Sequence, residues 1–178
     1  MRIAVLALVA VLSTASLGAG ERPRGPFVGV LLGLGATGCQ PKPEDQGECL
    51  VANNVARAAG GSLGVEIGLS LDHGLLVALE AESLSDYDRA GSASRFGPSI
   101  RYAPLSWFWL GAGPLLGTMT ASGGVASESG LGAQVGAGFE LLLGRHVGLG
   151  LRGQHAWLGN GFSMLTFDLG IRWQFRRD

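Results

Sequence analysis

Residues 166–175 alternate between apolar and polar side chains without a break. A strand over this range would place Phe167, Leu169, Ile171, Trp173 and Phe175 on one face and Asp168, Gly170, Arg172 and Gln174 on the other. A period of two with charge on one side predicts a sheet whose two faces meet different surroundings. The apolar face must therefore be buried by something other than this strand.

Seven earlier segments alternate in the same way, over residues 27–36, 62–70, 75–82, 95–102, 108–116, 131–140 and 147–154. All the charged side chains within these segments fall on one face, and the opposite face carries none. A closed barrel surrounded by lipid accounts for all of these segments, because the uncharged face of every strand would contact lipid. Closure also pairs the backbone groups of every strand and leaves no edge. The sequence predicts an all-β fold, an eight-stranded antiparallel up-and-down transmembrane β-barrel. Pro98 and Pro114 fall inside strands, where we expect a bulge or locally broken pairing.

The connections between the predicted strands alternate in length. Long links follow strands one, three and five, including a Ser/Gly-rich stretch at 118–130, and short turns follow strands two, four and six. Asp72-His73-Gly74 is typical of a tight hairpin turn. Outer-membrane barrels have short periplasmic turns and longer outer loops. The phase of the alternation therefore predicts periplasmic termini.

The N-terminus resembles a secretory signal peptide. Arg2 precedes an apolar run over residues 3–12, and small residues follow as far as Gly20. We expect residues 1–20 to be a cleavable signal peptide and 21–178 to form the barrel domain. A buried N-terminal helix or strand is the alternative.

Nine charged residues belong to the inward face of the predicted barrel. An eight-stranded barrel is barely wide enough for its own side chains, so opposite charges inside it would pair. A packed lumen is favoured over a wet channel. The predicted ion-pair network consists of Glu66, Glu80, Glu82, Arg95, Arg101, Glu140, Arg152, Asp168 and Arg172.

Aromatic residues lie near the predicted strand ends, as expected for girdles at the two membrane interfaces. The girdles are predicted to contain Tyr102, Trp107, Trp109, Trp157, Trp173 and Phe175, together with Phe27, Phe96, Phe108 and Phe162.

The two cysteines, Cys39 and Cys49, lie in one polar stretch without strand character. An exported chain with one nearby pair suggests a disulfide, with two free thiols as the alternative. No further residue near them in sequence would complete a metal site, so neither a metal nor another cofactor is expected.

The sequence contains one weak candidate for a catalytic residue. His155 is the histidine nearest the outer rim, where Ser83, Ser94 or Ser163 could approach it, but no triad motif surrounds it. Glu80 and Glu82 are better explained as partners of arginines than as acid–base carboxylates. The net charge of −1 gives no sign of nucleic-acid binding.

The chain resembles the small outer-membrane β-barrels that include the transmembrane domains of outer membrane protein A and X relatives. The resemblance rests on the signal peptide, the eight alternating segments, the glycine-rich runs 96–102 and 136–140, and the aromatic closing strand. Members usually end on a terminal aromatic that the barrel-assembly machinery reads, whereas here Arg176, Arg177 and Asp178 follow Phe175.

The resemblance implies location in the cell outer membrane of a Gram-negative bacterium, with outer-membrane lipid and the assembly machinery as partners. The leading functional hypothesis is a structural or surface-interaction role without catalysis, in which the loops bind an extracellular ligand. The alternatives are a lipid-modifying enzyme, a narrow pore and a soluble lipocalin-like carrier. A carrier of that kind would point its apolar residues inward.

Overall fold

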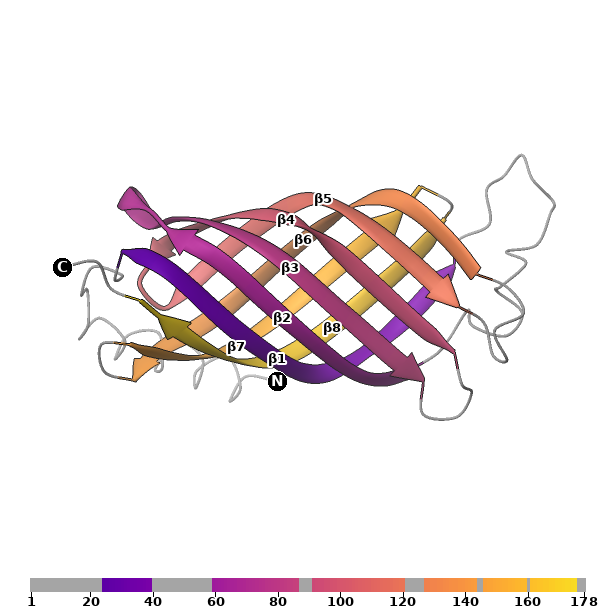
Figure 1. Cartoon of the computed structure of the whole chain (residues 1–178), viewed down its shortest axis with the longest axis horizontal. Helices are drawn as coiled ribbons and strands as arrows, with labels where there is room; N and C mark the ends of the chain where they lie inside the picture. The colour runs from indigo at the N-terminus through magenta and orange to yellow at the C-terminus, as the bar shows by residue number, and fades with distance from the viewer. Residues whose placement is uncertain are drawn as a thin grey trace, which may run out of the picture.

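Eight strands follow one another along the chain in a computed structural model that describes residues 24–39, 59–86, 91–120, 127–143, 146–159 and 161–175 (Figure 1). The predicted signal peptide, residues 1–20, lies outside the described residues. The strands are β1 (Gly25–Cys39), β2 (Ala59–Ser70), β3 (Leu75–Asp86), β4 (Ser92–Leu105), β5 (Phe108–Thr120), β6 (Ser127–Leu143), β7 (Val147–Leu158) and β8 (Phe162–Gln174).

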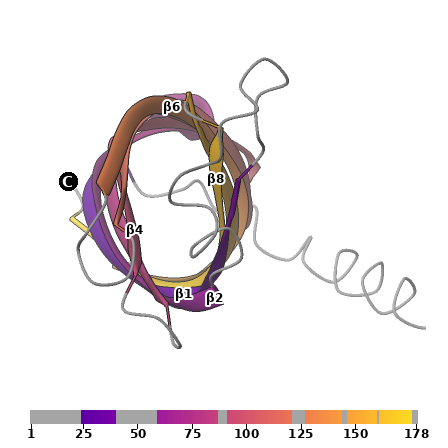
Figure 2. The ribbon, with the colours of Figure 1, turned by 90° about the vertical axis from the view of Figure 1, so that its right-hand side faces the viewer.

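Each strand pairs with its neighbours in the chain, and β1 pairs with β8 to close the sheet into a barrel. The closing seam is antiparallel and runs from Phe27 opposite Gln174 to Cys39 opposite Phe162. Figure 2 shows the resulting ring of strands. The predicted eight-stranded antiparallel up-and-down barrel is therefore confirmed. Among the described residues, no helix is long and apolar enough to cross a bilayer.

The two faces of the sheet differ as the alternation predicted. Leu32, Ile67 and Ile171 on the outside are each about 60% exposed, whereas Asp168 on the inside is 1% exposed. Large apolar side chains on the outer surface of a closed barrel are stable in contact with lipid. The outer face of the barrel is therefore a lipid-facing surface.

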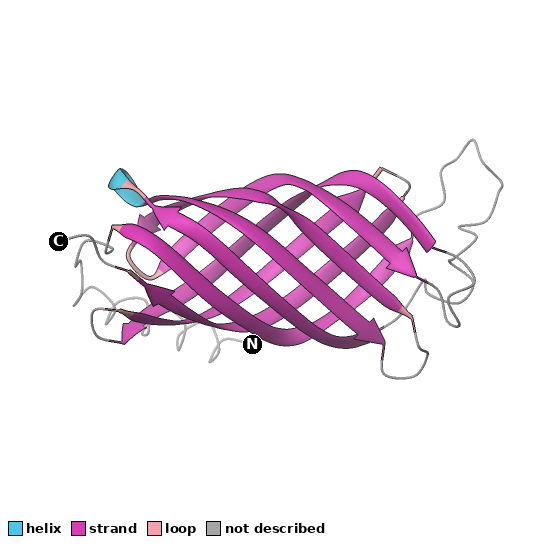
Figure 3. Cartoon of the chain, viewed as in Figure 1, coloured by secondary structure: helices cyan, strands magenta, loops and turns pink. Residues whose placement is uncertain are grey.

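Short turns join the strands at the end of the barrel that holds the start of β1 and the end of β8, here called the short-turn end. The turn between β2 and β3 contains a short 3₁₀ helix, η2 (Asp72–Gly74) (Figure 3). His73 and Gly74 have positive φ angles of 57° and 74°, and Gly tolerates that conformation without steric cost. The predicted hairpin turn is confirmed. The opposite end, where residues 40–58, 87–90 and 121–126 connect strands, is called the long-loop end.

The strands at the long-loop end are longer than predicted. The stretch 118–130 was expected to be a loop because it is rich in Ser and Gly, but β5 continues to Thr120 and β6 begins at Ser127. Thr118 pairs with Ser129 and Gly117 with Gly130. Backbone hydrogen bonds form the ladder, so small side chains do not prevent it, and Thr favours strands.

Pro98 and Pro114 share one gap in the ladder between β4 and β5. Phe96 pairs with Leu116 and Ile100 pairs with Ala112, while no ladder pairs form at the three positions between them. Continuing the register places Pro98 directly opposite Pro114, so the two missing N–H donors fall at the same position. The expected break in pairing is present there without a bulge, and the only register shift in this seam lies between Tyr102 and Leu105.

Candidate functional site

A belt of charged side chains crosses the inside of the barrel. It contains five acids and four arginines from strands β2, β3, β4, β6, β7 and β8, and each is at most 8% exposed. The structure brings together all nine residues predicted from the sequence, and each makes at least one ion pair within the belt. They are Glu66, Glu80, Glu82, Arg95, Arg101, Glu140, Arg152, Asp168 and Arg172.

Arg152 is the centre of this belt. Its Nε lies 3.2 Å from Asp168 Oδ2 on the neighbouring strand β8, in register with it. Its Nη1 and Nη2 cross the lumen to β3, 3.1 Å from Glu80 Oε2 and 2.8 Å from Glu82 Oε2. Glu66 Oε2 lies further away, 3.7 Å from Nη1. One guanidinium therefore neutralises carboxylates on opposite walls of the barrel.

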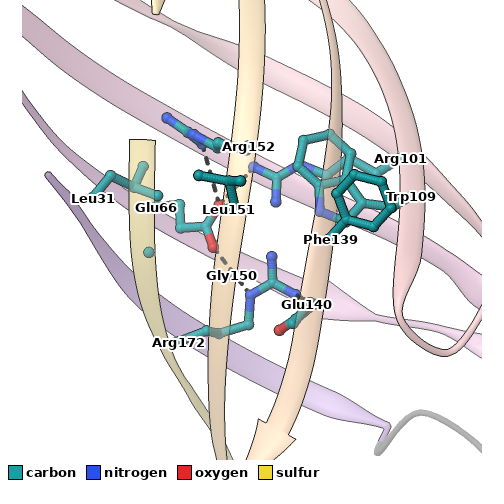
Figure 4. Close-up of a pocket in the computed structure, with 11 residues that line it drawn as sticks. Leu31, Glu66, Arg101, Trp109, Phe139, Glu140, Gly150, Leu151, Arg152 and Arg172 are labelled. Atoms are coloured by element: carbon teal, nitrogen blue, oxygen red, sulfur yellow. Dashed lines mark hydrogen bonds and ion pairs between the residues drawn. The ribbon is translucent and has the colours of Figure 1, made fainter. Parts of the chain in front are cut away.

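Two further arginines pair with Glu66 from opposite sides. Arg101 Nη2 lies 2.5 Å from Glu66 Oε2 and 2.9 Å from Glu80 Oε1. Arg172 Nε lies 3.0 Å from Glu66 Oε1, and its Nη1 lies 2.8 Å from Glu140 Oε2. Figure 4 shows Glu66 between Arg152 and Arg172.

Aromatic rings cover the two arginines nearest the short-turn end. The guanidinium carbon of Arg101 lies 4.5 Å from the centre of the Trp109 ring, and that of Arg172 lies 4.3 Å from the centre of the Phe27 ring. Cation–π contacts of this kind strengthen when the charge is desolvated. In Arg101 the Nε and Nη1 atoms have no hydrogen-bond acceptor, so the aromatic ring is an important partner of this guanidinium.

Neutral polar side chains complete the belt, and sequence reasoning did not single them out. Arg95 donates to Glu82, to Gln154 and, at 2.7 Å, to Gln134. Ser62 donates to Asp168 over 2.6 Å. Their positions in the sequence could have identified them, because each is a polar residue at an inward-facing position of its strand.

Apolar clusters close the lumen on both sides of the belt. The cluster at the short-turn end consists of Phe27, Leu76, Ala78, Ala103 and Trp109. The cluster at the long-loop end consists of Leu84, Ala93, Leu115, Met119, Ala156, Phe162 and Met164, with Leu158 against it. The cavity beside the belt, lined in part by Glu66, Arg101 and Arg172, measures about 30 Å³, room for one or two water molecules. The belt and the two apolar clusters therefore occupy the lumen along the described strands.

Trp109 was wrongly placed in the aromatic girdle. It is 3% exposed and lies inside the barrel, because its neighbours Phe108 and Leu110 occupy the outward parity. The girdle prediction is also wrong for Phe27 and Phe162, which are buried inside at 0% and 2% exposure. The other predicted girdle residues that have outward exposed side chains are Phe96, Tyr102, Trp157, Trp173 and Phe175. Trp107, in the turn before β5, stacks on Phe139 with ring centres 5.7 Å apart.

His155 lies on the outer face of β7, and its ring centre is 4.2 Å from that of Trp157. Ser94 donates to Ser83 over 3.2 Å on β4 and β3, strands that the closed barrel order separates from β7. Ser163 is the register partner of Trp157. The structure therefore brings neither Ser83 nor Ser94 to His155.

Among the described residues, no group of His, Cys, Asp and Glu is arranged to hold a metal ion. Cys49 lies outside the described residues, so the disulfide stays a prediction.

Comparison with models of protein families and with curated proteins finds no match. Comparison with solved structures does. Neisserial surface protein A (NspA) superposes with a TM-score of 0.69 at 16% identity, over 87% of this chain and 100% of that one. The N-terminal β-barrel domain of Pseudomonas aeruginosa OprF gives 0.58 at 12% identity, over 86% and 100%. Ail of Yersinia pestis, in complex with the heparin analogue sucrose octasulfate, gives 0.57 at 11%, over 86% and 99%.

The chain has the fold of the small outer-membrane β-barrels. This agrees with the resemblance drawn from the sequence. At these identities the likeness extends to the fold alone.

Proposed function

We propose that this chain is an integral outer-membrane protein that forms a closed, non-conducting barrel with a structural or surface-interaction role. The observation that carries this proposal is the filled lumen. The charged belt spans the barrel from β3 to β7 and β8, and apolar clusters lie above and below it. An ion on this path would have to displace paired charges and then pass a layer of buried apolar side chains, and both steps are costly.

The strand ends that flank residues 40–58, 87–90 and 121–126 all lie at the long-loop end of the barrel. Binding residues are commonly found on loops held by a rigid scaffold. We propose that the connections 40–58, 87–90 and 121–126 contact an extracellular ligand. The complex of Ail with a heparin analogue supports ligand binding as a role for a barrel of this fold. A disulfide between Cys39 and Cys49 would restrict the first connection.

Two other partners belong to this proposal. Outer-membrane lipid would cover the apolar outer face, where Leu169 and Ile171 are about 60% exposed. The barrel-assembly machinery would insert the chain, with the aromatic residues Trp173 and Phe175 at the end of β8 as its recognition element. Both residues are exposed on the outward face.

A lipid-modifying enzyme has less support than a binding barrel. His155 contacts Trp157 on the outer face, and its arrangement matches a histidine at a membrane interface. Replacing His155 by alanine is expected to leave the lipid profile of the cells unchanged. A change in lipid acylation would favour the enzyme instead.

The decisive experiment combines localisation with conductance. The full chain should be recovered in the outer-membrane fraction and should show heat-modifiable gel mobility. Reconstituted in planar bilayers, it should give no single-channel steps. Recovery as a soluble periplasmic protein would refute the membrane placement, whereas reproducible conductance steps would refute the closed lumen.

A further inference from the structure

The outer face of the barrel changes character at the long-loop end of β3, β4, β5 and β6. The last apolar row across these four strands consists of Ala81, Phe96, Leu116 and Leu131, which are register partners of one another. One outward position further along every strand, the partners are all hydroxyl residues. They are Ser83, Ser94, Thr118 and Ser129.

A second row of hydroxyl residues follows the first. Ser85 pairs with Ser92, and Ser92 pairs with Thr120. Within each row, directly opposite side chains lie about 5 Å apart. Between the rows, successive outward positions of one strand lie about 7 Å apart, so the two rows form one continuous surface. The hydroxyl patch is defined as Ser83, Ser85, Ser92, Ser94, Thr118, Thr120 and Ser129.

The patch faces outward and is accessible. Ser94, Thr118 and Ser129 are exposed. Leu84, between Ser83 and Ser85, and Met119, between Thr118 and Thr120, have the opposite parity and are buried in the lumen. Ser94 donates to Ser83 over 3.2 Å, which leaves further donors and acceptors of the patch open to a partner.

The patch covers one side of the barrel. On β7, β8, β1 and β2, the described outward positions at the same end carry Trp157, Gly159, Leu165, Ala36, Gly38, Ala59 and Gly61, with Ser163 as the hydroxyl among them. If the hydroxyl residues only marked where the strands leave the hydrocarbon layer, polar residues would be expected all around the barrel. The one-sided distribution instead indicates a surface with a partner.

The chemistry of the patch indicates what kind of partner it can bind. Its seven residues are uncharged, so it lacks the cationic groups that bind phosphate strongly. Hydroxyl groups both donate and accept hydrogen bonds, as do the hydroxyls of a sugar. The patch is also continuous with the lipid-facing row at Phe96 and Leu116. Sugars attached to a membrane lipid lie at this height.

We propose that the hydroxyl patch docks the saccharide part of a glycolipid in the leaflet at the long-loop end. This inference rests on the proposed outer-membrane placement, in which that leaflet carries lipopolysaccharide. The acyl chains would cover Phe96 and Leu116, and the first sugars would hydrogen-bond to Ser94 and Thr118. The barrel would thereby bind a glycolipid on the side formed by strands β3 to β6.

Vesicle reconstitution tests the proposal with the full chain. One set of phosphatidylcholine vesicles contains lipopolysaccharide with its core oligosaccharide, and a second contains the same lipid A without core sugars. Heat-modifiable mobility gives the unfolding midpoint in each. We expect the core sugars to raise the midpoint of the wild-type protein by about 2–4 °C.

The variant with Ser83→Ala, Ser94→Ala and Thr118→Val should lose this rise, because it keeps the strand but removes the hydroxyls. Ser163→Ala, on the opposite side of the barrel, is the matched control and should keep it. Equal midpoints in the two lipids, or a rise that survives the triple substitution, would overturn the proposal. Failure of the wild-type chain to insert at all would instead refute the outer-membrane placement.

A second measurement needs no variant. In nanodiscs, the amide resonances of Ser94 and Thr118 should differ between the two glycolipids, whereas that of Ser163 should not. Identical spectra at the patch would contradict sugar docking even if the triple variant failed to fold.

Discussion

Replacing Arg152 by methionine removes the central cation of the lumen while keeping most of the side-chain volume. Three carboxylates then lose a guanidinium that lies within 3.2 Å of them, namely those of Glu80, Glu82 and Asp168. Removing one partner of a buried ion pair costs about 3–5 kcal/mol, because the other charge stays buried without compensation.

The loss should stay within that range rather than triple, because two of the three carboxylates keep another arginine. Glu80 retains Arg101 at 2.9 Å, and Glu82 retains Arg95. Asp168 retains the Ser62 hydroxyl at 2.6 Å, which does not neutralise its charge. Adding Asp168→Asn to the Arg152→Met variant should therefore recover more than about 1 kcal/mol.

Urea unfolding in lipid vesicles, followed by tryptophan fluorescence and by heat-modifiable mobility, measures these free energies. Arg24→Met provides the matched control. Arg24 Nε pairs with Asp72 Oδ1 at 2.7 Å, but the two side chains are 61% and 55% exposed, so the expected loss is about 0–1 kcal/mol. Equal small losses for Arg152→Met and Arg24→Met would refute the argument, since they would mean that water screens the lumen charges.

Three further predictions concern the packing of the barrel. Gly33→Ala should lower the free energy of unfolding in urea by about 1–3 kcal/mol, because the new Cβ would overlap the backbone at Phe167. Gly150→Ala, where the nearest atom to the new Cβ lies 3.1 Å away, should lower it clearly less. Equal losses for the two variants would contradict the close approach at Gly33. Trp109→Leu should cost more than the lost packing, by about 1–2 kcal/mol for the lost cation–π contact, and a double-mutant cycle with Arg101→Met that shows no coupling would count against it. Pro98→Ala combined with Pro114→Ala should restore two ladder hydrogen bonds, stabilise the barrel by about 1–2 kcal/mol and protect both new amides from hydrogen exchange; unprotected amides would show that the gap has another cause.

The sequence alone was sufficient to assign the faces of the strands. The side-chain direction of a strand residue depends only on the local pleat, so the alternation by itself assigns Leu169 and Ile171 to lipid and Asp168 and Arg172 to the lumen. The same rule, applied to every residue, would also have placed Trp109 inside. Distance from the strand end, which predicts an aromatic girdle, does not distinguish the inner face from the outer face, whereas parity does.

Partners across the barrel required the tertiary structure, because they depend on the register of eight seams at once. Arg152 and Glu80 are 72 residues apart in the chain, and no local pattern relates them. The same registers place Pro98 opposite Pro114 and align Ser83, Ser94 and Thr118 in one row. Local alternation therefore decides which side of the sheet a residue occupies, while closure and stagger of the strands decide which residue it meets.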